Sequence, residues 1–329
     1  MALFFLTPLS LLHAMLELHG AGAPITGGST MSTQSRRPLA GFGWLKNGIS
    51  LGFRHPKSIF GGAAFLVLAL LLPSLPTLLI QFHLLGAGTP QSPAILLWLM
   101  PIGALFGLLI VPLYAGYLQV IDAAEHGLPA RARDIFKPYR QGEALRLIGY
   151  GLALIAIYIV MLGIIIAAAG RGIASWYMQV LTAQVNHQPP PGLPQGFGIA
   201  MALLTVLGLF MVGLYSVSLG QVALRRRGVF GAIGDGLAGA LKNLLPLLVL
   251  AVSVVLAWIV VVIALAIVVG LLALIGHFVG AWLMLVLIIP VYIALVLVTF
   301  AVMFGVMYYL WRDVCGDDTA HGVDQAIAA

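Results

Sequence analysis

Charged residues are scarce in this sequence. Asp, Glu, Lys and Arg make up 8% of its 329 residues, whereas a soluble globular domain carries about 25%. Because 61% of the residues are hydrophobic, the chain has too few charges to cover its surface in water. Several apolar runs exceed the ~18 residues that indicate a transmembrane helix. The runs are long and uniformly apolar rather than short and alternating, which excludes a β-barrel and predicts an all-α, polytopic transmembrane bundle.

Cysteine is nearly absent as well. Cys315 is the only one, so a disulfide framework and a cysteine-based metal site within one chain are excluded. His83, His187 and His277 fall in three separate connections, and no ligand spacing or neighbouring acid supports a metal site. The sequence contains no Ser-His-Asp arrangement, P-loop or HExxH motif. We therefore expect no catalytic residue, no cofactor and no metal, and we predict that the protein is not an enzyme.

Charge is also missing from the middle of the apolar runs. An intramembrane charge usually marks an ion or proton pathway, so its absence argues against an ion-coupled pump. Prolines interrupt several runs, however, and broken helices line substrate sites in transporters. A transporter or channel for a small neutral or lipid-like substrate is therefore the alternative function. It would require a water-accessible cavity at mid-membrane, lined by polar groups such as Tyr114, Tyr158, Ser216 and Thr299.

The apolar runs predict six spans. They cover approximately 59–81, 95–120, 147–169, 197–219, 244–275 and 281–311. Fifteen of the sixteen Lys and Arg residues lie before the first span, after the second and fourth, or after the sixth, and only Arg171 lies in the other connections. Because basic connections stay in the cytoplasm, we expect a multi-pass protein of the cytoplasmic membrane with both termini inside.

The two ends of the chain differ from the segment between them. Residues 1–30 contain no Lys or Arg. Their apolar run of about 15 residues is short for a span and lacks the positive flank of a signal peptide. Met31 opens a typical cytoplasmic N-terminus, so we expect the true start there, with a genuine extension or a cleaved signal as alternatives. We predict a disordered segment over 1–42, one six-span domain over 43–314 and a disordered cytoplasmic tail over 315–329.

One motif suggests a nucleotide site at first sight. The letters GDGLAG at 234–239 match the G-x-G-x-x-G fingerprint, which requires a preceding strand and an acid about 20 residues later. No strand is expected before it, and the next acid after Asp235 is Asp313. On a helical wheel the segment is amphipathic instead, with Asp235 and Lys242 opposite one apolar arc. It predicts a helix lying on the inner membrane surface. The residues of the apolar arc are Val229, Phe230, Ile233, Leu237, Ala240, Leu241 and Leu244.

Two other segments have this amphipathic character. In 44–54 the polar side chains share one face, and 133–140 is a weaker copy. The three segments begin near Trp44, Arg133 and Val229, roughly 89 and 96 residues apart, and each precedes two predicted spans. We therefore predict a threefold repeat, in which each unit is a cytoplasmic interfacial amphipathic helix followed by a hairpin of two spans.

Basic side chains in and near these segments are expected to contact anionic lipid headgroups. The candidates are Arg225, Arg226, Arg227, Lys242, Arg54, Lys57 and Arg140. In the second span, Gly103 and Gly107 form a GxxxG pattern that predicts close helix packing, within the bundle or in a dimer. The expected partners are membrane lipids and either a protein partner or a second copy of the chain. No nucleic acid is expected, because basic cytoplasmic connections account for the net charge of +6.

Four stretches carry a family resemblance: GWLKNGISLGFRHP, IFKPYRQGEALRLIG, ALKNLLPLLVL and YYLWRDV. Over about residues 43–314 the sequence resembles a loose group of uncharacterised bacterial six-span membrane proteins. The group is related to the membrane domain of membrane-anchored glycerophosphodiester phosphodiesterases. Since the soluble phosphodiesterase domain is absent, the resemblance does not imply that activity. It implies a bacterial inner-membrane protein, for which we expect an accessory or scaffold role in membrane or envelope organisation.

Overall fold

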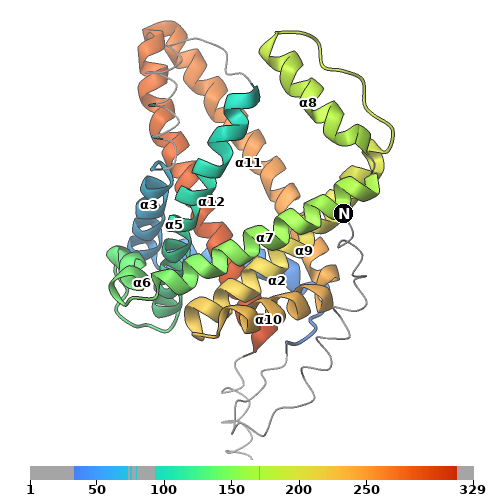
Figure 1. Cartoon of the computed structure of the whole chain (residues 1–329). Helices are drawn as coiled ribbons and strands as arrows, with labels where there is room; N and C mark the ends of the chain where they lie inside the picture. The colour runs from blue at the N-terminus through green and yellow to red at the C-terminus, as the bar shows by residue number, and fades with distance from the viewer. Residues whose placement is uncertain (1–32, 73–74, 76–78, 80–92, 170, 317–329) are drawn as a thin grey trace, which may run out of the picture. The chain divides into compact units, whose positions relative to one another are not determined.

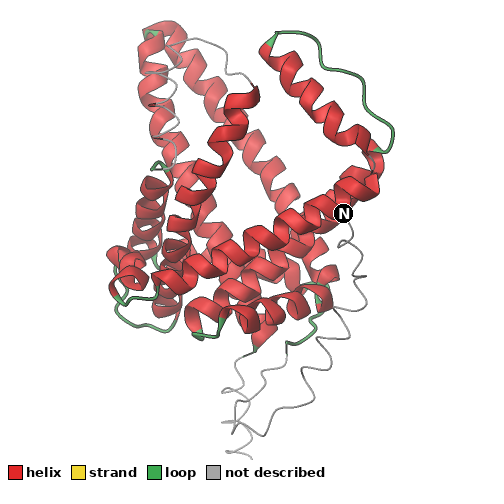
Figure 2. Cartoon of the chain, in the orientation of Figure 1, coloured by secondary structure: helices red, strands yellow, loops and turns green. Residues whose placement is uncertain are grey.

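The computed structural model describes residues 33–72, 75, 79, 93–169 and 171–316, and all regular structure within these residues is helical (Figure 2). The chain divides into two compact units, Met1–Ser32 and Thr33–Ala329, and the second contains every described residue. The α-helices, labelled in Figure 1, are α2 (Ala40–Arg54), α3 (Pro56–Leu70), α5 (Pro93–Glu125), α6 (Lys137–Arg140), α7 (Ala144–Ala169), α8 (Arg171–Val185), α9 (Phe197–Leu224), α10 (Val229–Lys242), α11 (Leu244–Val279) and α12 (Ala281–Cys315). The 3₁₀ helix η2 (Ala132–Phe136) directly precedes α6.

The predicted all-α class is confirmed for this part of the chain. Five helices are long and apolar enough to cross a membrane: α5, α7, α9, α11 and α12. The first predicted span, 59–81, is represented by α3, which has 15 residues and is shorter than the ~20 that a span requires. Most of the span beyond residue 72 lies outside the described residues, so a sixth span stays a prediction. His277, expected in a connection, lies in the last turn of α11.

Three central helices organise the packing. Helices α5, α9 and α12 contact one another, and each also contacts one earlier helix, α3, α7 and α11 respectively. The C-terminal halves of the central helices hold large, fully buried side chains such as Tyr117, Leu214 and Tyr308. In α9 and α12 the described side chains of the N-terminal halves are mostly exposed, as expected for apolar helices that lipid surrounds. We call the region where α5, α9 and α12 end, together with α2, η2, α6 and α10, the basic end (Figure 1).

Helix α10 has three faces rather than the two that the helical wheel predicts. Ile233 and Ala240 are buried, but Phe230 and Leu241 of the same apolar arc are 87% and 61% exposed. The buried face is completed by Ala232, Gly236 and Gly239 and packs on α9. The reason is close backbone approach: a Cβ added at Gly236 would lie 2.7 Å from the Leu214 carbonyl oxygen. The glycines therefore define the contact face, and the larger apolar side chains point away from the chain.

Helix α2 is built in the same way. Gly41, Gly48 and Gly52 lie on its buried face together with Trp44, Leu45 and Leu51, and this face packs on α12 and α11. Phe42, Ile49 and Phe53 are exposed and, spaced seven and four residues apart, lie along one side of the helix. The polar side chains, including Asn47 and Arg54, occupy the remaining side.

The folded unit extends further toward both termini than the sequence predicts. Residues 33–42, assigned to a disordered segment, include the first turn of α2 and a stretch that bonds to distant parts of the chain. The Arg36 amide donates to Asn243 Oδ1 over 2.8 Å, and the Gln34 amide donates to the Val314 carbonyl over 2.9 Å. At the other end, Cys315 is buried in the last turn of α12. The two predicted boundaries are corrected accordingly, while the predictions for 1–32 and 317–329, including the start at Met31, lie outside the described residues.

Glycine mediates close packing in this unit, but not at the predicted GxxxG pair. A Cβ added at Gly103 or Gly107 would meet no described atom within 4 Å. At Gly116, nine residues after Gly107 in α5, an added Cβ would overlap the Ile135 carbonyl of η2. At Gly220 of α9, an added Cβ would overlap the Trp311 ring. Contact within the chain thus occurs at Gly116 and Gly220, whereas contact through Gly103 and Gly107 stays a prediction for a second copy.

Candidate functional site

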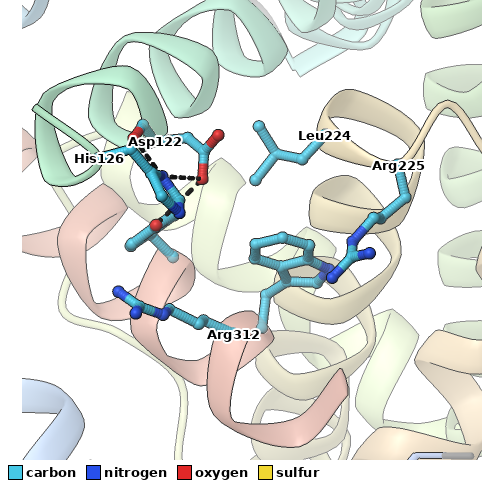
Figure 3. A pocket seen from close by; sticks show the side chains of 7 residues that line it. Asp122, His126, Leu224, Arg225 and Arg312 are labelled. Atoms are coloured by element: carbon cyan, nitrogen blue, oxygen red, sulfur yellow. Dashed lines mark hydrogen bonds and ion pairs between the residues drawn. The ribbon is translucent and has the colours of Figure 1, made fainter. Parts of the chain in front are cut away.

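A pocket of about 200 Å³ opens at the basic end, where the three central helices finish (Figure 3). Helix α5 contributes Asp122 and His126 to its lining. The end of α9 contributes Leu224 and Arg225, and α12 contributes Tyr308, Trp311 and Arg312. Each central helix therefore supplies part of the wall, and the wall combines one carboxylate, one imidazole, one phenol and two guanidinium groups.

The acidic side of the pocket is held in place by hydrogen bonds. The Tyr308 hydroxyl donates to Asp122 Oδ1 over 3.0 Å, and the same oxygen lies 3.4 Å from His126 Nδ1. His126 Nδ1 is also 2.8 Å from the Asp122 carbonyl oxygen. Asp122 and His126 lie four residues apart on one face of α5. All the described bonds of the carboxylate involve Oδ1.

The basic side is built around an aromatic ring. Trp311 is buried against Gly220, and the Arg225 guanidinium carbon lies 5.9 Å from the centre of its ring, a cation–π distance. The Trp311 Nε1 donor is buried and has no hydrogen-bond partner among the described residues. A buried donor of this kind is costly unless something accepts from it. Among the described lining residues, Arg225 and Arg312 supply guanidinium groups and Asp122 supplies a carboxylate.

A second polar cluster joins α2 to the central helices beside the pocket. The Glu125 side chain is only 6% exposed, and its Oε1 lies 3.2 Å from Arg54 Nη1 and 3.6 Å from His55 Nε2. The Tyr309 hydroxyl donates to Glu125 Oε2 and accepts from Arg54 Nη2. Arg54 is therefore tied to the interior of the chain. Removing Arg54 would therefore destabilise the protein, since the buried Glu125 carboxylate would be left as an uncompensated charge.

The arginine run at 225–227 divides among three environments. Arg225 lines the pocket. Arg226 Nε pairs with Glu143 Oε1 at 3.1 Å, which links the α9–α10 turn to the start of α7. Arg227 Nε pairs with Asp235 Oδ2 of α10 at 2.8 Å. Partial burial raises the pKa of Asp235, and the Arg227 guanidinium acts in the opposite direction.

Lys242 and Arg140, two other expected lipid contacts, also have partners among the described residues. Lys242 Nζ donates to the Thr33 carbonyl over 2.9 Å, and Arg140 Nη2 lies 3.7 Å from Asp134 Oδ1. Lys57, at the start of α3, is exposed to solvent. Most of these cations therefore hold the basic end together, and their contact with lipid headgroups stays a prediction.

Sequence reasoning did not single out Asp122, Glu125 or His126. Their spacing of three and four residues, at the end of an otherwise uncharged span, is the signal that could have identified them, because it places all three on one helix face. The polar residues expected of a transporter behave differently. Ser216 and Thr299 donate to carbonyls of their own helices, Val212 and Leu295, and neither lines the pocket.

Comparison with known proteins assigns no family to this arrangement. No family model matches the sequence, and no curated protein or solved structure matches it. Within the described residues, no group of three or more His, Cys, Asp or Glu side chains is placed to hold a metal ion.

Proposed function

We propose that the chain is a six-span, non-enzymatic protein of the bacterial cytoplasmic membrane that organises lipids or a protein partner at the inner surface. In this proposal the basic end faces the cytoplasm. The distribution of Lys and Arg supports that orientation. The helices at this end that are too short to span a bilayer would then form a layer in the interfacial region.

Helix contacts support a cyclic threefold design. The proposed units are α2–α3–α5, η2–α6–α7–α9 (with α8 between the spans) and α10–α11–α12. Each short segment packs on the last span of the preceding unit: η2 on α5, α10 on α9, and α2 on α12. The last span of each unit also contacts the first long helix of the next, α5 with α7, α9 with α11, and α12 with α3. The same contacts thus recur three times and close into a ring.

Equivalent residues occupy equivalent places in this scheme. Gly116, Val217 and Gly305 each lie eleven residues before a glycine that follows a central helix. Each contacts the short segment packed on its helix. A Cβ at Gly116 would overlap the Ile135 carbonyl, one at Gly305 would lie 3.0 Å from the Gly48 Cα, and one at Gly239 would lie 3.1 Å from a Val217 methyl. Such closeness at matched positions favours repetition of one unit over a chance arrangement of helices.

The observation that carries the functional proposal is the exposed apolar side of α2 and α10. Phe53 and Phe230 are 82% and 87% exposed, yet Arg54 directly follows Phe53 and Arg227 lies three residues before Phe230. Aromatic groups beside cations are typical of helices that lie in the headgroup region. A surface of this kind fits a protein that contacts lipid or another membrane protein from within the bilayer.

Native mass spectrometry after gentle extraction from membranes tests the proposal. We expect the full chain to retain phospholipid and to appear with a partner or as an oligomer. A chain that is consistently solitary and free of lipid would contradict the accessory role. Reporter fusions test the orientation separately: a periplasmic reporter should be active after residue 190 and inactive after residue 320. An active periplasmic reporter at 320 would overturn the orientation.

A further inference from the structure

The surface around α2 carries three cations that no described residue neutralises. Residues 33–72 contain five Lys and Arg residues and no Asp or Glu. Arg36 pairs with Asp313 of α12, and Arg54 pairs with Glu125 of α5. The other three cations are exposed, and their side chains have no partner among the described residues: Arg37, Lys46 and Lys57.

These three cations adjoin the exposed apolar side of α2. Lys46 follows Phe42 by four residues and precedes Phe53 by seven, so it borders their row on the helix. Arg37 lies just before the first turn of α2, and Lys57 lies in the first turn of α3, directly after α2. We infer that α2 binds anionic phospholipid selectively: the three cations contact the phosphate groups, and the apolar row lies among the upper acyl chains.

The spacing of the cations fits a lipid surface rather than one small anion. Helix α2 has 15 residues and is about 22 Å long, since an α-helix rises about 1.5 Å per residue. With one cation near each end and one near the middle, a single phosphate cannot contact all three. A soluble anion would also leave the adjoining apolar row unused, whereas a helix in the headgroup region buries such a row. The anionic groups therefore belong to lipids.

Helix α10 also exposes an aromatic side chain, Phe230, but the cations near its two ends are bonded within the chain. Arg227 pairs with Asp235. Lys242 donates to the Thr33 carbonyl. The two helices should therefore differ in their selectivity for lipid charge. This inference rests on the proposed function, which places both helices at the inner membrane surface, and it identifies α2 as the helix that selects the lipid.

Fluorescence quenching at α2 tests the selectivity in the full chain. Cys315→Ala provides the background, and a fluorophore is attached at Phe53→Cys. The bilayer contains phosphatidylcholine and phosphatidylglycerol with identical acyl chains, and one of them at a time carries a quencher near its headgroup. Each cation near an anionic surface raises the local concentration of anionic lipid about fivefold. We therefore expect labelled phosphatidylglycerol to quench as strongly as an at least about fivefold higher concentration of labelled phosphatidylcholine.

Charge variants assign the effect to the three cations. In the triple variant Arg37→Gln, Lys46→Gln, Lys57→Gln, the two labelled lipids should quench the probe equally. The triple variant Arg37→Lys, Lys46→Arg, Lys57→Arg keeps the charges and should keep the preference. A probe at Phe230→Cys on α10 is the matched positional control, which the two lipids should quench equally. Raising the salt from about 0.1 M to 1 M shortens the screening length from about 10 Å to about 3 Å and should remove the preference without any substitution.

Three results would overturn the inference. The first is equal quenching of the Phe53 probe by the two lipids, which would still support the position of α2 in the membrane. The second is a preference that survives both high salt and the glutamine substitutions; if the glutamine variant does not fold, as judged by circular dichroism, the salt series decides. The third is an equal preference at Phe230, which would exclude selection by α2. A Phe53 probe that neither lipid quenches would contradict the proposed function as well, and an acidic protein would become the candidate partner of α2.

Discussion

The indole Nε1 of Trp44 donates a 2.9 Å hydrogen bond to Asp313 Oδ2, which joins α2 to the end of α12 across 269 positions of the sequence. Asp313 Oδ1 also lies 3.0 Å from Arg36 Nε. One carboxylate therefore holds both the segment before α2 and α2 itself. Since Arg36 and Asp313 are each about a third exposed, the ion pair contributes less than the bond to the buried indole.

Asp313→Ala should lower the free energy of unfolding by about 1–3 kcal/mol, because Trp44 Nε1 would be buried without an acceptor. Asp313→Asn retains an acceptor for Trp44 Nε1, so its free energy of unfolding should fall less. The measurement is thermal unfolding in detergent, followed by size-exclusion chromatography with fluorescence detection. Equal melting temperatures for the alanine variant and the native chain would show that the bond does not hold α2.

Glycine substitutions in α5 should have opposite effects at two places. Gly116→Ala introduces a methyl group against the Ile135 carbonyl and should destabilise the protein by about 1–3 kcal/mol. Gly103→Ala meets open space and should be neutral or stabilise by up to about 1 kcal/mol through helix propensity. The same melting assay checks both. If Gly103→Ala or Gly107→Ala instead shifts the oligomeric state in native mass spectrometry, the predicted packing between copies is supported.

The long helices could be predicted because each one is specified by a continuous apolar run in its own sequence. Runs such as 244–275 are apolar throughout, so the helices follow from the need to satisfy backbone hydrogen bonds within each segment. The face that α10 presents to α9 could not be predicted by the same reasoning. A helical wheel groups residues by hydrophobicity, and Gly236 and Gly239 contribute almost none. Their role depends on how closely two backbones approach, which only the folded structure shows.

The candidate site was missed for a related reason. Asp122, Arg225 and Tyr308 belong to three helices far apart in the sequence, and no spacing connects them. Asn243 is similar: it is fully buried and bonds to residues 34 and 36, although it reads as the polar edge of a surface helix. Counting charges treated Arg225–Arg227 as one basic patch. The structure gives each arginine a different partner or setting.

Removing Arg227 should destabilise the protein more than removing the charge of its partner Asp235. Arg227→Gln leaves the Asp235 carboxylate, 13% exposed, without its counter-ion and should cost about 1–3 kcal/mol at neutral pH. Asp235→Asn removes the buried charge and should cost less, because burial already raises the pKa of Asp235. Adding Asp235→Asn to Arg227→Gln should restore most of the loss.

The pH dependence of Arg227→Gln follows from the direction of that shift. Without the arginine, the pKa of Asp235 in the folded state rises further above its unfolded value of about 3.9. The folded state then holds more protons than the unfolded state between the two pKa values, so stability is retained below the unfolded pKa and falls as pH rises through this window. The deficit relative to the native chain should be small near pH 4 and largest near neutrality. A deficit independent of pH would show that lost packing, rather than the buried charge, is responsible.

The exposed apolar sides of α2 and α10 should lie at headgroup depth in a bilayer. Because Cys315 is the only cysteine, its replacement by Ala provides a background for labelling one position at a time. A fluorophore attached at Phe53→Cys or Phe230→Cys should be quenched by lipids that carry a quencher near the headgroup, and less by lipids that carry it near the chain end. Asn47→Cys, on the polar side of α2, is the control and should respond to a water-soluble quencher instead. If all three positions respond equally to the aqueous quencher, α2 and α10 do not lie on the membrane, and Phe53 and Phe230 become candidates for a protein interface.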